Sequence, residues 1–204
     1  MKVAVFVDVQ NDFVKNGALP FAYPAEDNVP KVIEFAKECR SKGYAIFATA
    51  DTHQKTKYMT NSDGEVLGPE SGYMTTLEGK KLPIEHCING TIGHQIVEGL
   101  VKDEDRNVII PEGHIVDKCT FGTIDLPRLI DIEVTEHLEE TIDEIVICGY
   151  CTSICVISNA LLLRAYFKDV PITLRADLCG DINEQSHKAA CQVAANCQID
   201  VVNE

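Results

Sequence analysis

The feature that most constrains this chain is the alternation of short, wholly apolar runs with longer segments of helical periodicity. The first run, Lys2–Val9, places five apolar residues in succession, from Val3 to Val7. A strand without polar alternation is covered on both faces, which is typical of parallel sheets flanked by helices. The sequence therefore predicts an α/β fold.

The same alternation continues to the end of the chain. Further buried strands are predicted at Tyr44–Ala50, Glu104–Pro111, Glu144–Gly149, Val170–Leu174 and Ile199–Val202. Helices are predicted at Ala25–Lys42, Ile92–Val101, Ser153–Phe167 and Asn183–Asn196. We expect a three-layer sandwich with a mostly parallel sheet of about six strands and helices on both faces. The prediction is one domain over residues 1–204, with a loop excursion at about 54–90.

Composition and charge exclude several classes of function. The net charge of −14 disfavours binding to nucleic acid or to anionic membranes. The apolar runs are shorter than the eighteen or so residues that span a bilayer, and the N-terminal run lacks the features of a signal peptide. The nine cysteines are an odd number, which argues against a disulfide framework. We therefore expect a cytoplasmic protein.

Ligands of parallel α/β sheets bind at the carboxyl ends of the strands, so reactive side chains at those positions are candidates for chemistry. Asp8 stands at the end of the first strand, where a carboxylate is costly unless it is paired or functional. Lys118 follows the third predicted strand, although a lysine there is usually a solvated surface residue. Neither residue is specific by itself.

Cys155 lies in the first turn of a predicted helix, just after the strand that ends at Gly149. Unpaired N–H groups and the helix dipole stabilise a thiolate at such a position and can also form an oxyanion hole. The alternatives are a buried cysteine on an apolar helix, or a metal or cluster site formed with Cys148 and Cys151, for which no fourth ligand lies nearby.

Asp51 and His53 stand at positions i and i+2, on the same side of an extended segment, and His86 follows later. Two histidines and one carboxylate form a common site for zinc, iron or manganese. By itself, the Asp-x-His pattern is weak.

The order of these features along the chain resembles the isochorismatase-like cysteine hydrolase family. The motifs that carry the resemblance are Val7-Asp8-Val9-Gln10-Asn11-Asp12-Phe13, Asp51-Thr52-His53, Lys118 in Lys-x-Thr-Phe-Gly, and Gly149-Tyr150-Cys151-Thr152-x-x-Cys155-Val156. A further stretch, His86-Cys87-Ile88-x-Gly90-Thr91-x-Gly93, is similar to the nicotinamidase branch.

The resemblance implies roles for the matching residues. It implies a catalytic triad of Asp8, Lys118 and Cys155, and a divalent metal, best zinc with iron or manganese as alternatives. The implied metal ligands are Asp51, His53 and His86, the implied oxyanion donors are the N–H groups of Cys151 and Cys155, and the implied substrate contacts are Phe13 and Tyr150. A cis peptide bond is implied between Tyr150 and Cys151.

The implied function is metal-assisted cysteine amidohydrolysis of a small-molecule amide, with nicotinamide as the expected substrate, in a homo-oligomer. Lys118 and the helix N-terminus would lower the pKa of Cys155. The chain departs from the family pattern because Thr52 fills the place of a usual tryptophan and residues 54–85 contain no histidine. Only Ser62, Asp63 and Glu65 are candidates for a fourth ligand.

Alternative functions remain, some of them enzymatic and one non-enzymatic. The chain could be a family hydrolase of another kind, either a ureido or carbamoyl amidase or an isochorismatase. It could also be a non-catalytic binding domain of the same fold.

Overall fold

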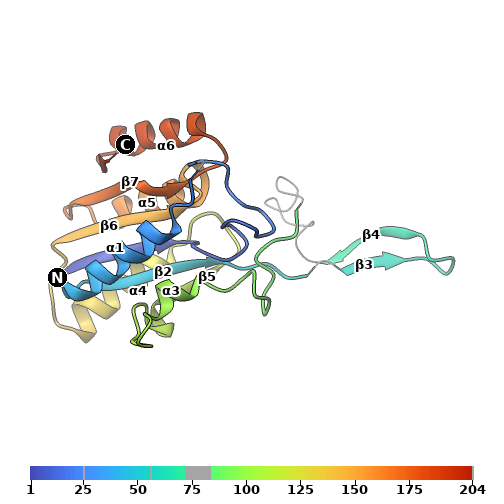
Figure 1. The fold of residues 1–204 in the computed structure, drawn as a ribbon, viewed down its shortest axis with the longest axis horizontal. Coiled ribbons are helices and arrows are strands. Elements are labelled where there is room, and N and C mark those ends of the chain that lie inside the picture. Colours follow the sequence, from blue (N-terminus) through green and yellow to red (C-terminus); the bar gives the residue numbers. More distant parts are fainter. Residues whose placement is uncertain (25, 56, 72–83, 204) are drawn as a thin grey trace.

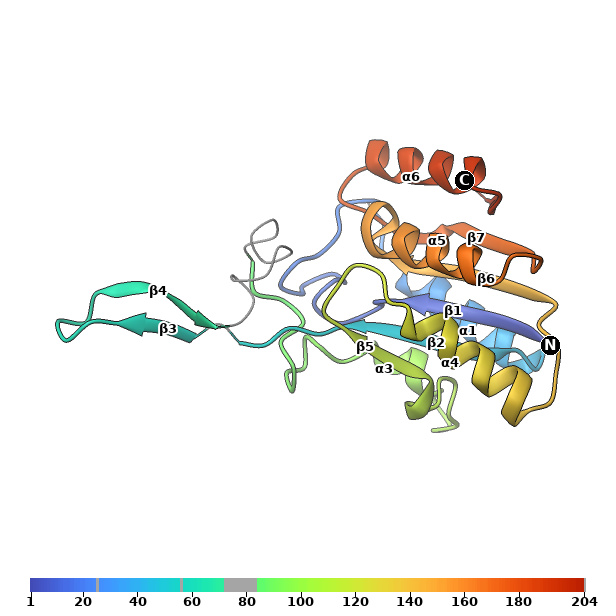
Figure 2. The same cartoon turned by 180° about the vertical axis from the view of Figure 1, so that it is seen from behind.

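The computed structural model describes residues 1–24, 26–55, 57–71 and 84–203; positions 25, 56, 72–83 and 204, which include part of the predicted excursion, lie outside the described residues. The main sheet contains β1 (Lys2–Val7), β2 (Ala45–Asp51), β5 (Ile115–Lys118), β6 (Glu144–Tyr150), β7 (Ile172–Gly180) and β8 (Asp200–Val202). A separate hairpin of β3 (Lys57–Thr60) and β4 (Val66–Ser71) projects from the body (Figures 1 and 2).

The main sheet has the order β5-β2-β1-β6-β7-β8, and all of its neighbouring strands are parallel. This confirms the predicted α/β fold with a parallel sheet. The chain builds outward from β1 to β2 and β5, and then crosses to the other side of β1 for β6, β7 and β8. A crevice forms at the carboxyl ends of the strands where the winding reverses. The functional site is therefore expected beside the ends of β1 and β6.

Helices cover both faces of the sheet, as α1 lies over one face and α4 and α5 over the other (Figures 1 and 2). The helical segments are α1 (Val29–Ser41), α3 (Glu98–Val101), η2 (Glu112–His114), α4 (Asp125–Asp131), η3 (Ile132–His137), η4 (Thr152–Val156), α5 (Ile157–Tyr166) and α6 (Glu184–Asn196). In α1, the buried residues Val32, Ala36 and Cys39 form the stripe that faces the core. The Asn183 side chain caps α6 by accepting a hydrogen bond from the Ser186 N–H.

The predicted strand at Glu104–Pro111 is wrong. Ile109 and Ile110 are buried there, but they lie outside the sheet, and the strand beside β2 is β5, which begins at Ile115. β5 is an edge strand of four residues with mixed burial, so its sequence lacks the continuous apolar run of a central strand. Lys118 is therefore the last residue of β5 itself, and its position is not set by the predicted strand at Glu104–Pro111.

Other elements also differ from the predictions: α1 begins at Val29 and not at Ala25, and α4 and η3 were not predicted. Within the predicted helix Ile92–Val101 only Glu98–Val101 is helical, and the Ile92 side chain is 76% exposed. The fifth strand extends to Gly180 instead of ending at Leu174. Among the described residues, every helix falls short of the length and apolarity needed to cross a bilayer.

Candidate active site

The predicted triad residues come together at the carboxyl edge of the sheet. The Lys118 Nζ lies 2.6 Å from Asp8 Oδ2 and 3.7 Å from Cys155 Sγ. The Thr49 hydroxyl donates to the other Asp8 oxygen, Oδ1, over 2.6 Å. All three triad side chains are buried. The sheet thus brings an acid, an amine and a thiol from β1, β5 and the segment after β6 into one group.

Burial and charge act in opposite directions on these groups. Burial raises the pKa of Asp8, and the neighbouring Lys118 only partly offsets it. Burial would lower the pKa of Lys118, yet the negative charges around it, Asp8 first and Asp51 among the others, together outweigh burial, and the pKa rises. The ammonium form of Lys118 is thereby stabilised beside the carboxylate.

The expectation that Cys155 has a lowered pKa is wrong in sign. Burial raises the pKa of this thiol well above its ordinary value; Lys118 opposes the rise, whereas Asp8 adds to it. Before any substrate binds, Cys155 is therefore a neutral thiol next to the Asp8–Lys118 ion pair. Attack by its sulfur requires a proton acceptor, and Asp8 is the nearby carboxylate that can serve.

The turn that carries Cys155 depends on a glycine. Gly149 has φ +126°, and a Cβ built on it would lie 2.1 Å from the Val7 carbonyl oxygen of the neighbouring strand. Only glycine combines this backbone conformation with so close an approach. The next peptide bond, Tyr150–Cys151, is cis, as the resemblance implied. Cys155 then lies within η4, at the start of the helical segment.

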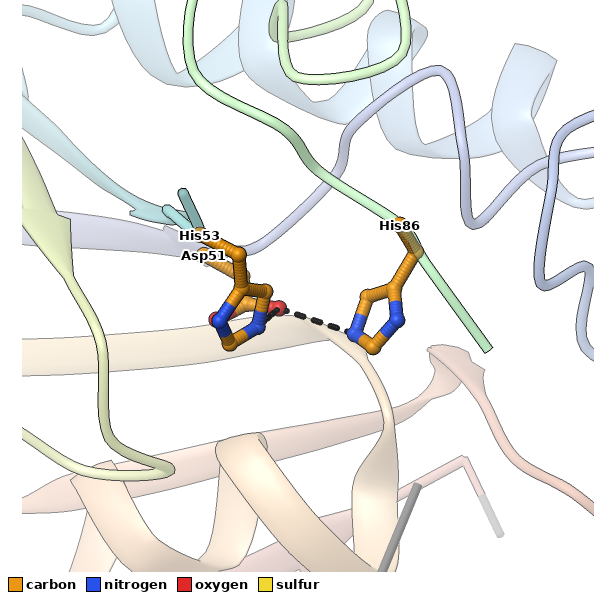
Figure 3. A group of neighbouring side chains, drawn as sticks. All are labelled: Asp51, His53 and His86. Carbon is orange, nitrogen blue, oxygen red and sulfur yellow. Dashed lines mark hydrogen bonds and ion pairs between the residues drawn. The ribbon is translucent and has the colours of Figure 1, made fainter. Parts of the chain in front are cut away.

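Asp51, His53 and His86 form a second group of side chains (Figure 3), which lies beside the triad because Lys118 Nζ is 3.9 Å from Asp51 Oδ1. Their donor atoms all lie within 4.8 Å of one another, and all three residues are buried. His53 Nε2 is 2.9 Å, and His86 Nε2 3.2 Å, from Asp51 Oδ2. The Ile84 carbonyl oxygen lies 2.7 Å from His86 Nδ1, an arrangement that directs Nε2 towards the group.

The chemistry of this group fits a divalent metal ion. Two imidazoles and a carboxylate are ligands for zinc, iron or manganese. The Asp51 Oδ1 atom is buried and has no hydrogen-bond partner among the described residues. Burial alone would raise the pKa of Asp51, but hydrogen bonds from His53 and His86 bring it below its ordinary value. The carboxylate is therefore ionised, as metal binding requires.

Both groups open onto one cavity of about 190 Å³. Its lining residues are Phe13, Leu19, Pro20, Phe21, Ala22, Asp51, His86, Phe121, Cys151, Ile154, Cys155 and Ile182. The walls are mostly apolar and aromatic, and the polar groups converge at one end. Such a cavity fits a small, flat, largely apolar molecule with one polar group directed at the thiol.

Residues 2–203 match the isochorismatase domain. The chain belongs to the isochorismatase family. It is similar to the nicotinamidase of Schizosaccharomyces pombe, with 26% identity over 98% of this chain and 92% of that protein. Its fold resembles that of nicotinamidase PncA from Bacillus subtilis, with a TM-score of 0.69, 21% identity and 98% of both chains covered. It also resembles pyrazinamidase of Pyrococcus horikoshii in complex with zinc, with a TM-score of 0.65, 21% identity, and 100% of this chain and 99% of that chain covered.

In this isochorismatase-family chain, the two predicted substrate contacts lie in different places. Phe13 lines the cavity that contains Cys155. Tyr150 is among the lining residues of a neighbouring cavity of about 230 Å³ instead, and its hydroxyl donates to Asn28 Oδ1 over 2.6 Å. The Tyr150 ring packs against Phe21, with 5.4 Å between ring centroids. Tyr150 thus packs against Phe21, which itself lines the cavity that contains Cys155.

The candidates for a fourth metal ligand, Ser62, Asp63 and Glu65, do not join the metal group. They lie between β3 and β4, at the outer end of the hairpin (Figure 1), and are exposed. Asn61 holds this turn, because its side chain accepts from the Glu65 N–H and donates to the Glu65 carboxylate. The described part of the chain therefore supplies three protein ligands to the group.

Sequence reasoning pointed to the position of Gln10 but assigned it no role. The Gln10 side chain is fully buried, accepts from the Asp51 N–H over 2.7 Å and donates to the Asp51 carbonyl over 2.8 Å. It also donates to the His94 carbonyl. Gln10 therefore fixes the backbone of a candidate metal ligand, and its place after an apolar strand was the available signal.

Asp181 was missed entirely. It follows β7, and the rule that polar groups after strands are candidates would have found it had that strand not been predicted to end at Leu174. The Asp181 carboxylate is fully buried and accepts hydrogen bonds from the turn that carries Cys155.

Proposed function

We propose that this protein is a nicotinamidase, which hydrolyses nicotinamide to nicotinate and ammonia through a thioester on Cys155. The observation that carries the proposal is that the triad thiol and two candidate metal ligands, Asp51 and His86, line one small apolar cavity. Membership of the isochorismatase family and similarity to proteins named as nicotinamidases support the same function.

In the first half of the reaction, Asp8 accepts the proton of the Cys155 thiol while the sulfur attacks the amide carbonyl carbon. Lys118, 2.6 Å from Asp8 and 3.7 Å from the sulfur, keeps the carboxylate ionised at rest and offsets the charge that develops on sulfur. The N–H groups of Cys151 and Cys155 are proposed to bind the oxyanion. Protonated Asp8 then gives its proton to the departing ammonia, which leaves a thioester.

In the second half, Asp8 takes a proton from a water molecule that attacks the thioester carbonyl. The carbon–sulfur bond breaks, nicotinate is released, and the proton returns to the sulfur of Cys155. One water is consumed and one ammonia is formed for each amide.

We propose that Asp51, His53 and His86 hold a divalent metal, with zinc favoured and iron or manganese as alternatives. A metal held by these residues would supply a Lewis acid at the end of the cavity where Asp51 and His86 lie, which would help to orient the ring. The protein side chains then position the carboxamide at Cys155, while Phe13, Phe21 and Phe121 exclude water from the ring faces. We further propose a cytoplasmic homo-oligomer, which size-exclusion chromatography with light scattering can test.

Ammonia release from nicotinamide tests this proposal directly. We expect Cys155→Ala to lower kcat by at least about 10³-fold, because the nucleophile is removed, while the melting temperature changes by only a few degrees. Parallel assays with ureido, carbamoyl and isochorismate substrates separate the alternative hydrolases. No turnover of any of these by the metal-loaded protein, with no thiol reacting faster than a free cysteine, would instead favour a non-catalytic binding domain.

A further inference from the structure

The reactive cavity contains two thiols with different neighbours. Cys151 and Cys155 both line it, four residues apart in one turn. The Cys155 sulfur lies 3.7 Å from the Lys118 ammonium, whereas the Cys151 thiol donates to Asp181 Oδ1 over 2.9 Å. Cys155 therefore lies next to the Asp8–Lys118 ion pair, which includes a cation, whereas Cys151 lies next to the Asp181 carboxylate.

The Asp181 carboxylate is held by hydrogen bonds alone. Its Oδ2 accepts from the Ser153 N–H over 2.7 Å, and its Oδ1 accepts from the Ser153 hydroxyl and from the Ile182 N–H, over 2.9 Å and 2.6 Å. Among the described residues, no cationic side chain forms an ion pair with it, although it is fully buried. A buried carboxylate without a counter-ion is costly unless its charge has a role.

The charge of Asp181 opposes thiolate formation at Cys151. A thiolate there would place two negative charges within hydrogen-bonding distance, with no cation to offset them. Burial raises the pKa of the Cys151 thiol to about 12, and the hydrogen bond to Asp181 adds to the effect. Burial also raises the pKa of Cys155, but there the cation Lys118 opposes the rise, and Cys151 has no such cation among its described hydrogen-bond partners.

Asp181 also connects the turn to the rim of the cavity. Its backbone N–H donates to the Tyr23 carbonyl over 2.7 Å, and its carbonyl accepts from the Tyr23 N–H over 3.0 Å. The segment just before Tyr23, residues 19–22, forms part of the cavity wall. The side chain of Asp181 thus fixes residues 151–153, while its backbone fixes the facing wall.

We propose that Asp181 is a positioning residue that selects the nucleophile: it holds the Cys151 thiol as a protonated donor and keeps the Cys151 N–H in place for the oxyanion, so that only Cys155 reacts. The selection between the two thiols stands on the hydrogen bonds of Asp181. The oxyanion part rests on the proposed amidohydrolase function.

Alkylation by iodoacetamide, mapped by mass spectrometry, tests the selection without any substrate. In the Cys155→Ser chain, we expect Cys151 to remain at least about tenfold less reactive than the exposed Cys119. In Cys155→Ser/Asp181→Asn, which keeps the shape of the side chain, we expect the Cys151 rate to rise at least about tenfold. Rapid labelling of Cys151 in Cys155→Ser alone would overturn the proposal, as would an unchanged rate in a folded double variant.

Asp177→Asn is the matched control. Asp177 lies within β7, the strand that Asp181 follows, and pairs with Arg175 over 2.8 Å instead of contacting Cys151, so removal of its charge should leave the Cys151 rate unchanged. A rise in this control equal to that of Asp181→Asn would show a general loosening of the strand and would contradict the proposal. Thermal melts establish that each variant is folded.

Steady-state kinetics of Asp181→Asn test the second part. We expect kcat to fall at least about tenfold with KM changed by less than about threefold, because an oxyanion donor acts mainly on the transition state. If instead KM rose by about tenfold and kcat stayed at its native value, the oxyanion role would be overturned. If the native chain does not hydrolyse nicotinamide, the proposed function fails, and the alkylation rates still decide the thiol selection.

Discussion

The two halves of the cavity are built in different ways. The triad half takes Asp8 from the end of β1, Lys118 from the end of β5, which lies beyond β2, and Cys155 from the turn after β6. The metal half takes Asp51 from the end of β2, but His86 comes from the chain that returns after the hairpin excursion. One half is thus fixed by the sheet, and the other depends on a loop.

The backbone of Cys87, the residue after the loop ligand His86, is held from two sides. The His53 N–H donates to the Cys87 carbonyl over 3.0 Å, and the Cys87 N–H donates to Asp12 Oδ2 over 2.7 Å. Loops tolerate sequence change better than sheet strands. The comparison teaches that the metal half depends on how the chain returns after the hairpin, whereas the triad half depends on the sheet itself.

The largest expected effect would come from breaking the sheet-built half. In Lys118→Met, the Asp8 carboxylate loses the ammonium that lies 2.6 Å away. We predict that kcat for nicotinamide falls by at least about 10³-fold. The free energy of unfolding, measured in urea, should fall by about 3–5 kcal/mol, because a buried charge is left uncompensated.

The control for this variant is Asp8→Asn/Lys118→Met, which removes both charges. It should regain most of the lost stability and none of the activity. A Lys118→Met protein that retained more than about a tenth of the native kcat would contradict the sheet-built triad.

A smaller effect is expected from the loop-built half. We predict that His86→Ala lowers the bound metal, measured by elemental analysis, by more than about tenfold. KM should rise more than kcat falls, because the metal orients the substrate. The rate of Cys155 alkylation should stay within about twofold of the native rate, since the triad contacts are separate.

His53→Ala provides the comparison from the strand side of the same group. It should lose metal to a similar extent. The metal half as described would be wrong if either variant kept full metal occupancy, or if metal-free native protein kept its native KM.

The smallest effect is expected at Tyr150. A variant there tests whether this residue belongs to the neighbouring cavity and not to the cavity that contains Cys155. In Tyr150→Phe, the hydroxyl that donates to Asn28 Oδ1 is lost, and we predict a loss of about 1 kcal/mol in unfolding free energy. kcat/KM should stay within about threefold of the native value, because the hydroxyl points away from Cys155. A tenfold rise in KM would instead restore the sequence-based prediction that Tyr150 contacts substrate.

The central part of the fold followed from the sequence because its strands are buried on both faces. Continuous apolar runs identified β1, β2 and β6, which lie side by side in the sheet. β5 lies beside β2, at the edge. The edge strand β5 was misplaced, because an edge strand needs no such run. The error at β7 affected the prediction of the site. Because the predicted strand ended at Leu174 and not at Gly180, Asp181 was not considered as a residue at the end of a strand.

The sequence by itself determined the parallel α/β architecture and the identity of the side chains that could do chemistry, because burial periodicity and residue type are local properties. Only the tertiary structure decided that Lys118 touches both Asp8 and Cys155, that burial raises the pKa of the Cys155 thiol, and that the Cys151 thiol donates to Asp181. Those properties depend on distances between strands that are far apart in the chain, and on the exclusion of water from the space between them.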